Sequence, residues 1–156
     1  MVKTRVADYS RGLIVITQFY MGLTVTISTK FESTSTINQG TSFNLGNSIL
    51  EKWGCYTAQK QAILGMTKST FHSYQKDPSK AALTREQLER LSCLANIHEA
   101  LSAVFTNPDN TFGFMRMVNN NPFFNSRTPL SMIENGSLGD LYEVYKHIDA
   151  MKNGEW

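Results

Sequence analysis

Apolar residues recur at intervals of three and four through most of the chain, the spacing of one face of an α-helix. The clearest stripe predicts a long helix over residues 84–105 and consists of Leu88, Leu91, Leu94, Ala95, Leu101 and Phe105. Shorter apolar stretches predict a helix ending at Gly54 and others over 58–64, 67–76, 107–118, 128–135 and 137–153. The pattern therefore predicts an all-α fold.

Start and stop signals lie at the ends of these segments. Thr84 followed by Gln87 forms a capping box, in which each side chain hydrogen-bonds the other residue's backbone. Further starts are a capping residue followed by proline, at Asn107-Pro108 and Thr128-Pro129. Asp77-Pro78 and Asn135-Gly136 are stop signals. The signals divide the chain at the places where the apolar periodicity breaks.

The segment over residues 57–77 has the pattern of a helix-turn-helix. Thr57 is expected to cap the first helix, Gly65 to take the positive φ of the turn, and Thr67 to cap the second helix. Phe71 and Tyr74 would point into the core. In such a motif the second helix enters the major groove of DNA. The residues expected to contact DNA are Lys60, Lys68, Ser69, Thr70, His72 and Ser73. The alternative is a helical hairpin that only packs against the rest of the fold.

Charge is unevenly distributed along the chain. Residues 41–106 carry a net charge of +2 and residues 107–156 a net charge of −2, and within 52–80 the net charge is +4. A basic face followed by a mildly acidic segment fits a nucleic-acid binder joined to a second module. An ordinary solvated surface is the alternative.

The first 44 residues lack the helical pattern. Residues 12–27 are largely apolar and follow a short basic segment, the outline of an export signal or membrane anchor, but polar residues such as Thr17 and Gln18 interrupt the run. Alternation over 23–28 favours a strand, and Met21 is an alternative start. Residues 29–48 have linker composition. We expect residues 1–44 to be a poorly ordered extension and linker, with no membrane association.

The chain carries no recognisable catalytic motif. It has no phosphate-binding loop, no His-Glu-x-x-His pair and no nucleophile elbow. Cys55, His72, Cys93 and His98 match no usual zinc-ligand spacing, and His98 lies on the apolar side of the long helix, where a core histidine is expected. His147 is expected to be exposed. We therefore expect neither an enzyme nor a bound metal or cofactor.

The C-terminal stretch carries a resemblance to a known family. It contains the motif N-x-x-F-x-S-R-x-P-L over residues 121–130, then two short helices and the tail Asn153-Gly154-Glu155-Trp156. This resembles the toxin-binding domain of Xre/MbcA/ParS-type antitoxins of RES-domain toxin–antitoxin systems, in which a glycine usually stands at the position of Ser126. The segment 83–91 is similar to the same family, so the resemblance covers roughly residues 50–156.

The resemblance implies that two regions of the chain have different functions. It implies a helix-turn-helix DNA-binding region over 45–106 and a toxin-binding domain over 107–156. Residues implied to bind the toxin are Arg127, Asn153, Gly154, Glu155 and Trp156. The tail would dock in the catalytic cleft of a RES-domain toxin that consumes NAD+ or uses it to modify a target, unless Trp156 packs on its own helices.

The same resemblance implies how the protein works in the cell. It implies a dimer that blocks its toxin and represses its own operon. The cytoplasmic location is expected from the two cysteines, Cys55 and Cys93, which form no C-x-x-C pair and fit reduced thiols. A stand-alone transcriptional regulator with no toxin partner is the alternative function.

Overall fold

The computed structural model describes residues 15–20, 23–28 and 38–154, which belong to two compact units, residues 1–37 and 38–156. In the first unit, β1 (Val15–Tyr20) and β2 (Leu23–Ser28) pair antiparallel, with Val15 opposite Ser28 and Tyr20 opposite Leu23. The strand predicted over 23–28 is thus present. The basic segment and the possible start at Met21 lie outside the described residues. No helix in the described ranges is long and apolar enough to cross a membrane.

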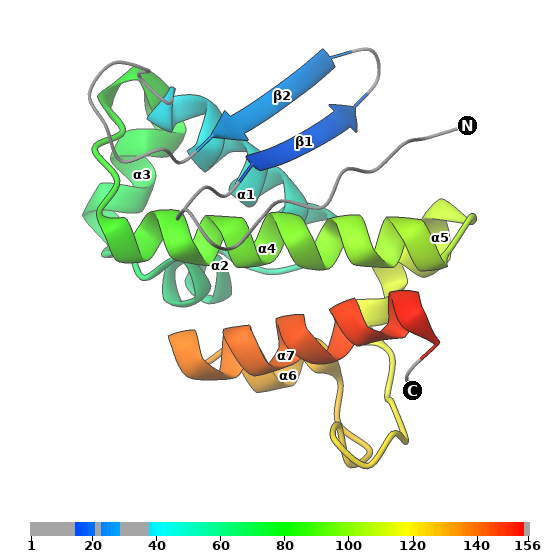
Figure 1. The fold of residues 1–156 in the computed structure, drawn as a ribbon. Coiled ribbons are helices and arrows are strands. Elements are labelled where there is room, and N and C mark those ends of the chain that lie inside the picture. The colour runs from blue at the N-terminus through cyan, green and yellow to red at the C-terminus, as the bar shows by residue number, and fades with distance from the viewer. Residues whose placement is uncertain (1–14, 21–22, 29–37, 155–156) are drawn as a thin grey trace. The chain divides into compact units, whose positions relative to one another are not determined.

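The second unit is built from helices (Figure 1). They are α1 (Gln39–Lys52), α2 (Thr57–Leu64), α3 (Lys68–Lys76), η2 (Pro78–Lys80), α4 (Arg85–Val104), α5 (Pro108–Gly113), η3 (Phe114–Arg116), α6 (Pro129–Ile133), α7 (Leu138–Ala150) and η4 (Met151–Asn153). This confirms the all-α class for residues 38–154, and the hairpin of β1 and β2 adds two strands outside the helical unit.

The predicted capping signals start most of these helices. Thr84 accepts a hydrogen bond from the backbone of Gln87 at 3.2 Å, and the Gln87 side chain accepts one from the backbone of Thr84 at 3.0 Å. The side chains of Thr67, Asn107, Thr128 and Ser137 cap α3, α5, α6 and α7. The prediction for α2 was wrong by one residue. Tyr56 is its N-cap, and the Tyr56 N–H donates to the Gln59 side chain at 3.2 Å.

The first helix begins at Gln39, earlier than residue 45, where we expected the folded region to start. Asn38 caps it by accepting a hydrogen bond from the backbone of Thr41 at 3.1 Å. Its first turns are poor in apolar side chains because they pack through glycine. A Cβ at Gly40 would collide with the backbone of Pro78, and one at Gly46 with Leu91. The start of α1 therefore packs by close approach at these glycines and not through a stripe of apolar side chains. Hydrophobic periodicity detects only such stripes, so it missed the start of this helix.

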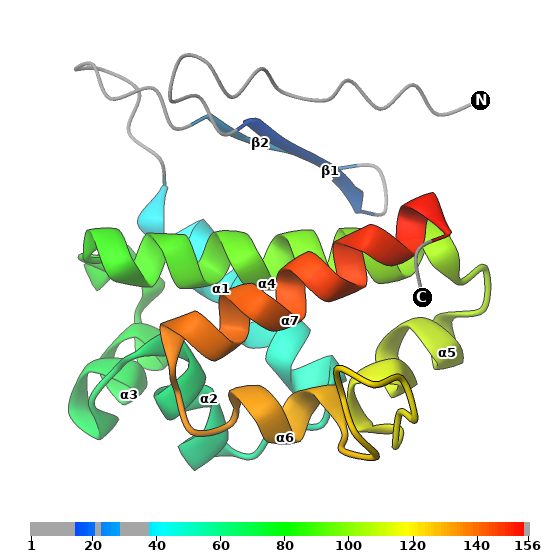
Figure 2. The ribbon, with the colours of Figure 1, turned by 60° about the horizontal axis from the view of Figure 1, so that its bottom comes forward.

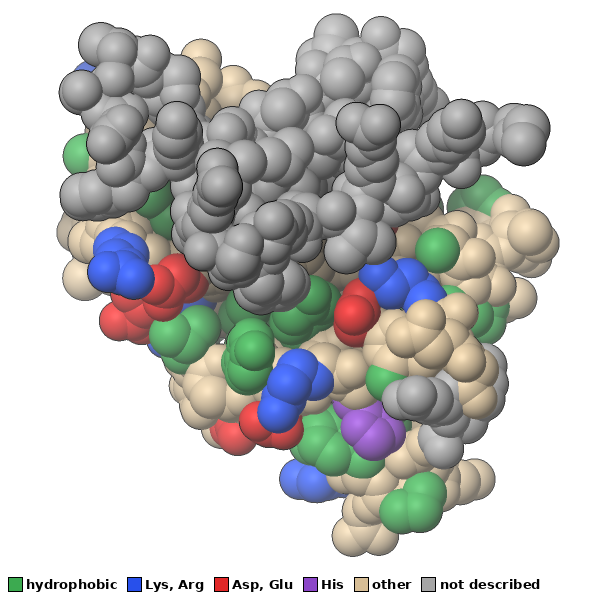
Figure 3. All heavy atoms as spheres, in the orientation of Figure 1, with side chains coloured by type: hydrophobic (Ala, Val, Ile, Leu, Met, Phe, Trp, Pro, Cys, Tyr) green, Lys and Arg blue, Asp and Glu red, His purple; other side chains and the backbone are tan. Residues whose placement is uncertain are grey.

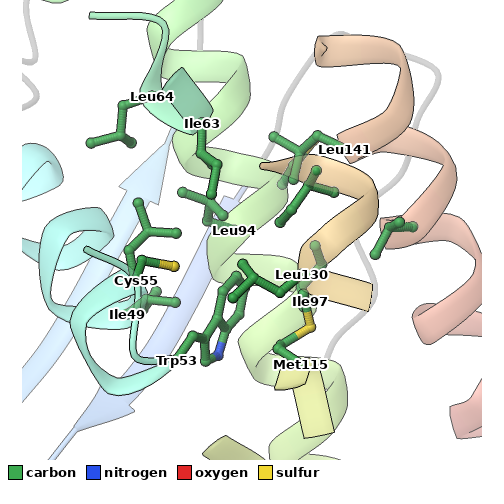
Figure 4. Close-up of a cluster of buried hydrophobic side chains, with 14 of the residues drawn as sticks. Ile49, Trp53, Cys55, Ile63, Leu64, Leu94, Ile97, Met115, Leu130 and Leu141 are labelled. Atoms are coloured by element: carbon green, nitrogen blue, oxygen red, sulfur yellow. The ribbon is translucent and has the colours of Figure 1, made fainter. Parts of the chain in front are cut away.

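A single hydrophobic core joins the helix-turn-helix to the C-terminal helices. α7 lies alongside α4 in both views of the ribbon (Figures 1 and 2). Figure 4 shows side chains from across the helical unit in one cluster, including Ile49, Trp53, Ile63, Leu94, Ile97, Met115, Leu130 and Leu141. The two functional segments that the sequence separates at residue 106 therefore share buried contacts and are expected to stabilise each other.

The turn between α6 and α7 packs directly on α2. The Gln59 side-chain amide donates to a Glu134 carboxylate oxygen at 2.7 Å. Gly136 has a φ of +79°, and a Cβ placed on it would lie 2.5 Å from the Ala62 carbonyl oxygen. The absence of a side chain at Gly136 is what lets the C-terminal helices approach the helix-turn-helix so closely.

Replacing Gly136 with alanine should therefore destabilise the protein by about 2–4 kcal/mol, since it combines an unfavourable φ with a backbone collision. The matched control is Gly154→Ala, because Gly154 has a similar φ of +77° and a Cβ added there would have no neighbour within 4 Å among the described residues. That variant should lose only about 1 kcal/mol. Urea unfolding of both variants measures the difference. Equal losses would show that the contact between Gly136 and Ala62 carries no energy.

Candidate functional site

The turn between α2 and α3 has the geometry that the sequence predicted. Gly65 takes a φ of +63°, and Met66 is buried beneath the turn. The Thr67 hydroxyl accepts a hydrogen bond from the backbone of Thr70 at 3.2 Å and also contacts the Ser69 hydroxyl at 3.2 Å. The start of α3 is therefore fixed by its own cap.

Opposite faces of α3 serve the core and the solvent. Phe71 and Tyr74 are buried and meet the ring of Phe43 edge-on, with centroids 5.6 and 5.7 Å apart. The other side of the helix presents its polar residues, of which Lys68, Ser69, His72 and Ser73 are exposed and Thr70 is half-buried. Five of the six residues expected to contact DNA thus lie together on α3.

Lys60 is the exception among these six residues. Its side chain is buried, and its ammonium lies 3.9 Å from a carboxylate oxygen of Glu51. A groove contact needs an exposed cation, so the expectation that Lys60 contacts DNA is not supported by its position. The sequence pattern could not detect this because the burial comes from packing of α2 against α1.

Ion pairs reduce the positive charge predicted over residues 52–80. Besides Lys60, Lys80 is paired, 3.5 Å from Asp77. The hydroxyl and backbone N–H of Ser79, followed by the charge of Lys80, lower the pKa of Asp77, which keeps this carboxylate ionised. Within the described residues Lys68 and Lys76, both on α3, form no ion pair. Helix α3 therefore carries positive charge that no acidic side chain in the described ranges offsets.

Two side chains of α4 hold the end of α2 and the turn that follows. Arg90 is buried, donates to the Ile63 carbonyl at 3.0 Å, and pairs with Glu86 at 2.7 Å. The Gln87 amide donates to the Gly65 carbonyl at 3.0 Å. These bonds satisfy carbonyl groups that a helix end leaves open. We did not predict this role of Arg90 from the sequence. Its position beside the apolar stripe of α4 could have indicated that the arginine is buried and hydrogen-bonded.

The segment 119–127 folds into a tight turn at the start of the C-terminal module. The Asn119 N–H donates to the Arg127 carbonyl at 3.1 Å, and the Ser126 N–H donates to the Asn119 carbonyl at 3.0 Å. Asn125 and Ser126 have φ values of 49° and 59°, in the left-handed region. Ser126 therefore keeps the conformation for which glycine is favoured, and the hydroxyl it adds donates to the Asn120 side chain at 3.2 Å.

The turn is pinned to α7 through His147. The Asn121 side-chain oxygen accepts a hydrogen bond from the Phe123 backbone at 2.9 Å and lies 3.1 Å from Nε2 of His147. The imidazole stacks on the Phe123 ring, with centroids 4.2 Å apart. His147 is half-buried, so the prediction that it would be exposed was wrong. Loop residues distant in sequence cover it, which helical periodicity alone does not reveal.

The residues implied to bind a toxin lie at one end of the molecule as far as they are described. Arg127 is exposed and its Nε donates to the Phe124 carbonyl at 3.1 Å. Asn153 and Gly154 are exposed, where η4 ends in a left-handed Gly154. In both ribbon views the end of η4 lies at the same end of the unit as the turn over 119–127 (Figures 1 and 2). Glu155 and Trp156 lie outside the described residues.

The face of the helical unit shown in Figure 3 has no extended patch of one charge among its described residues. Basic side chains lie next to acidic ones there. The ion pairs on α7 and η4 are Glu143–Lys146, at 2.8 Å, and Asp149–Lys152. A hydrogen bond from Lys146 to Glu143 raises the pKa of the lysine. This mixture differs from the unpaired lysines of α3, so the two ends of the fold suit different kinds of partner.

Three of the residues considered as metal ligands, Cys55, Cys93 and His98, are buried at separate places in the core. Burial raises the pKa of both thiols, Cys55 and Cys93, to about 11. His98 is buried and stacks in parallel on the Phe112 ring, with centroids 5.4 Å apart. Within the described ranges no three His, Cys, Asp or Glu side chains gather as metal ligands do. His98 is a core histidine, as its place on the apolar side of α4 indicated.

The pKa of His98 makes stability depend on pH. Burial, followed by the nearby charge of Lys52, lowers the pKa of His98 from 6.5 to about 4. Above pH 6.5 the imidazole is neutral in both states, but below it the unfolded chain gains a proton that the folded chain cannot hold. The free energy of unfolding should fall between pH 6.5 and 4, by up to about 3 kcal/mol from this group.

Urea unfolding at about pH 7.5 and about pH 4.5 tests this dependence. His98→Leu should lose the part of the pH dependence that His98 causes, whereas His72→Gln, which removes an exposed histidine, should keep it. An unchanged pH dependence in His98→Leu would contradict the assignment to His98.

Comparison with known proteins agrees with this geometry over the first half of the helical unit. Residues 34–96 match the family model of the antitoxin Xre-like helix-turn-helix domain, a range that includes α1, α2, α3 and much of α4. The chain is also 28% identical over 107 residues to the uncharacterized protein y4oB of Sinorhizobium fredii, covering 68% of this chain and 80% of that protein. Residues 34–96 are therefore similar to a DNA-binding domain found in antitoxins, and the exposed face of α3 is the candidate nucleic-acid interface.

Proposed function

We propose that this protein is the antitoxin of a type II toxin–antitoxin system. The observation that carries the proposal is the α2–turn–α3 unit, within a segment that matches an antitoxin helix-turn-helix domain. It is followed along the chain by the turn that bears the exposed Arg127 and by the exposed residues Asn153 and Gly154. The activity we propose is binding to DNA and to a toxin, and the place we propose for it is the cytoplasm.

The proposed inhibition is steric. The tail beginning at Asn153 leaves the last helix at the same end as the turn that bears Arg127, and it contains Glu155 and Trp156. A large aromatic ring and a carboxylate suit a pocket built for a nucleotide, lined by aromatic and basic groups. We therefore propose that the tail occupies the NAD+ site of a RES-domain toxin, with Arg127, Asn153 and Gly154 as further contacts.

The proposed regulation uses α3 as the recognition helix. Lys68 would contact phosphate or guanine, and the short side chains of Ser69, Thr70, His72 and Ser73 would approach base edges or phosphates. A homodimer would present two such helices to a palindromic operator. Binding there would repress the protein's own operon.

The test is a pull-down of the tagged protein from its native host, with partners identified by mass. A stoichiometric partner that consumes NAD+ or transfers its ADP-ribose once freed supports the antitoxin function. Recovery of DNA with no protein partner would contradict it.

The second candidate is a stand-alone helix-turn-helix regulator without a toxin. It is favoured by one observation, that the matched family model covers the DNA-binding segment and ends at residue 96. In that case the C-terminal helices would serve dimerisation. A toxin gene adjacent to this one, and formation of the complex in vitro, would decide between the two.

A further inference from the structure

We propose that the pair Asn153-Gly154 is a site of spontaneous deamidation, and that the other Asn-Gly pair, Asn135-Gly136, is protected from the same reaction by its surroundings. The modification lies at the start of the tail that is proposed to inhibit the toxin. The reactivity of the site is independent of the proposed function, whereas its effect on the toxin rests on that function.

The reaction needs an asparagine side chain, the backbone nitrogen of the next residue, and water. The backbone N of Gly154 attacks Cγ of Asn153, so that the N–Cγ bond forms and the Cγ–Nδ2 bond breaks. The side-chain nitrogen leaves as ammonia and takes the proton of the Gly154 N–H. Water then opens the cyclic imide at Cγ, which gives aspartate, or at the main-chain carbonyl, which gives isoaspartate. Glycine favours the attack because it has no side chain in the way.

The two Asn-Gly pairs have similar backbone turns. Both glycines are left-handed, with φ values of +79° at Gly136 and +77° at Gly154. Each glycine N–H donates to an earlier carbonyl, that of Ile133 at 3.0 Å and that of Met151 at 3.1 Å. Both asparagines are exposed. Since the turn and the access of water are alike, a difference in reactivity must come from the contacts around each pair.

The side chain of Asn135 is held at both of its polar atoms. Its Nδ2 donates to an Asp140 carboxylate oxygen at 3.1 Å, and its Oδ1 accepts from the Ser137 N–H at 2.8 Å. The glycine beside it lies against α2, where a Cβ on Gly136 would come 2.5 Å from the Ala62 carbonyl oxygen. Closing the imide ring turns the amide and moves the glycine nitrogen, so it would break both hydrogen bonds and disturb this packing.

Asn153 lacks these restraints within the described part of the chain. Its side chain forms no hydrogen bond to another described residue, and a Cβ added to Gly154 would have no described neighbour within 4 Å. Ring closure there breaks only the bond from Gly154 to Met151, where η4 ends. Because two fewer hydrogen bonds must break, we expect Asn153 to deamidate roughly tenfold or more faster than Asn135.

Deamidation changes the tail in two ways. Either product replaces the neutral amide of residue 153 with a carboxylate. Isoaspartate also carries the main chain through the former side chain, which adds a methylene to the backbone ahead of Glu155 and Trp156. An anchor residue binds by filling a pocket of fixed position, so isoaspartate is expected to weaken the proposed contact with the toxin.

The experiment ages the purified full-length protein in mildly alkaline buffer and follows both Asn-Gly pairs by peptide mass mapping. Enzymatic methylation of isoaspartate distinguishes the two products. Asn135 serves as the internal control for reactivity, because it is in the same sample. Circular dichroism and Tm of the aged protein show whether its fold is intact.

Binding to the protein partner recovered in the pull-down is measured before and after ageing. The comparison variant is Asn153→Gln, because glutamine would have to close a larger ring and reacts far more slowly. Asn153 is itself a proposed toxin contact, so each protein is compared only with its own unaged sample. We expect the fraction of wild type that binds the partner to fall in step with isoaspartate, and the fraction of Asn153→Gln that binds to stay at its starting value.

The outcomes separate this inference from the proposed function. Deamidation of Asn135 as fast as that of Asn153 would overturn the assignment of the reactive and the protected pair. Isoaspartate at residue 153 with undiminished binding would overturn the effect on the toxin and leave the antitoxin function standing. Unaged wild type that binds no protein partner would overturn the antitoxin function, while the peptide map would still decide which pair reacts.

Discussion

Deletion of Gly154–Trp156 should abolish neutralisation of the toxin and leave the fold intact. The proposed block depends on a large aromatic ring filling the catalytic cleft, and such anchors carry a large share of binding energy. We expect a loss of affinity for the toxin of roughly 100-fold or more, and a return of its NAD+-dependent activity in a mixture that wild type silences.

The structure explains why the truncation should not unfold the protein. Met151 is the last buried residue that is described, while Asn153 and Gly154 are exposed. Trp156→Ala is the narrower companion variant and should lose most of the same affinity. Full neutralisation by the truncated protein would overturn the mechanism. A fall in Tm of several degrees would show instead that Trp156 packs on its own helices.

Local chemistry made much of the helical fold predictable. Residues such as Thr67, Thr84 and Asn107 act within one helical turn, so a capping side chain can be recognised from its neighbours alone. The same holds for Gly65, whose positive φ follows from its place after a helix. These signals predicted the helix order and the exposed face of α3 without tertiary information.

Apart from the N-cap of α2, which was misplaced by one residue, the failures involve contacts between distant segments. Lys60 is buried against α1, and His147 is covered by the turn that holds Asn121 and Phe123. The early start of α1 depends on glycines that let another backbone or side chain approach. Contacts of this kind do not alter the hydrophobic periodicity of either segment, so the sequence pattern of one segment alone cannot reveal them.

The shared core has a consequence for how the two proposed activities can be separated. Gln59 and Gly136 tie the C-terminal helices to α2, so variants that disturb the core should impair DNA binding and toxin binding together. Only changes to exposed side chains can report on one activity alone. The polar face of α3 offers such positions.

Lys68→Ala combined with Ser69→Ala should abolish operator binding and leave toxin neutralisation intact. Both side chains are exposed at the start of α3, where a recognition helix contacts DNA. Loss of two contacts of about 1–3 kcal/mol each should weaken binding by about 30-fold or more. The cap survives, because the Thr67 hydroxyl still accepts from the backbone of Thr70.

Fluorescence anisotropy with DNA from the protein's own promoter measures this loss, and Lys76→Ala is the matched control. Lys76 is also exposed and, within the described ranges, forms no ion pair, but it lies in the last turn of α3, away from the end expected to enter the groove. Its removal should lower affinity only through the general attraction to phosphate, and should do so equally on unrelated DNA. Loss of neutralisation in the double variant would show that α3 also contacts the toxin. Equal effects of the two variants would mean that charge, and not the start of α3, determines DNA binding.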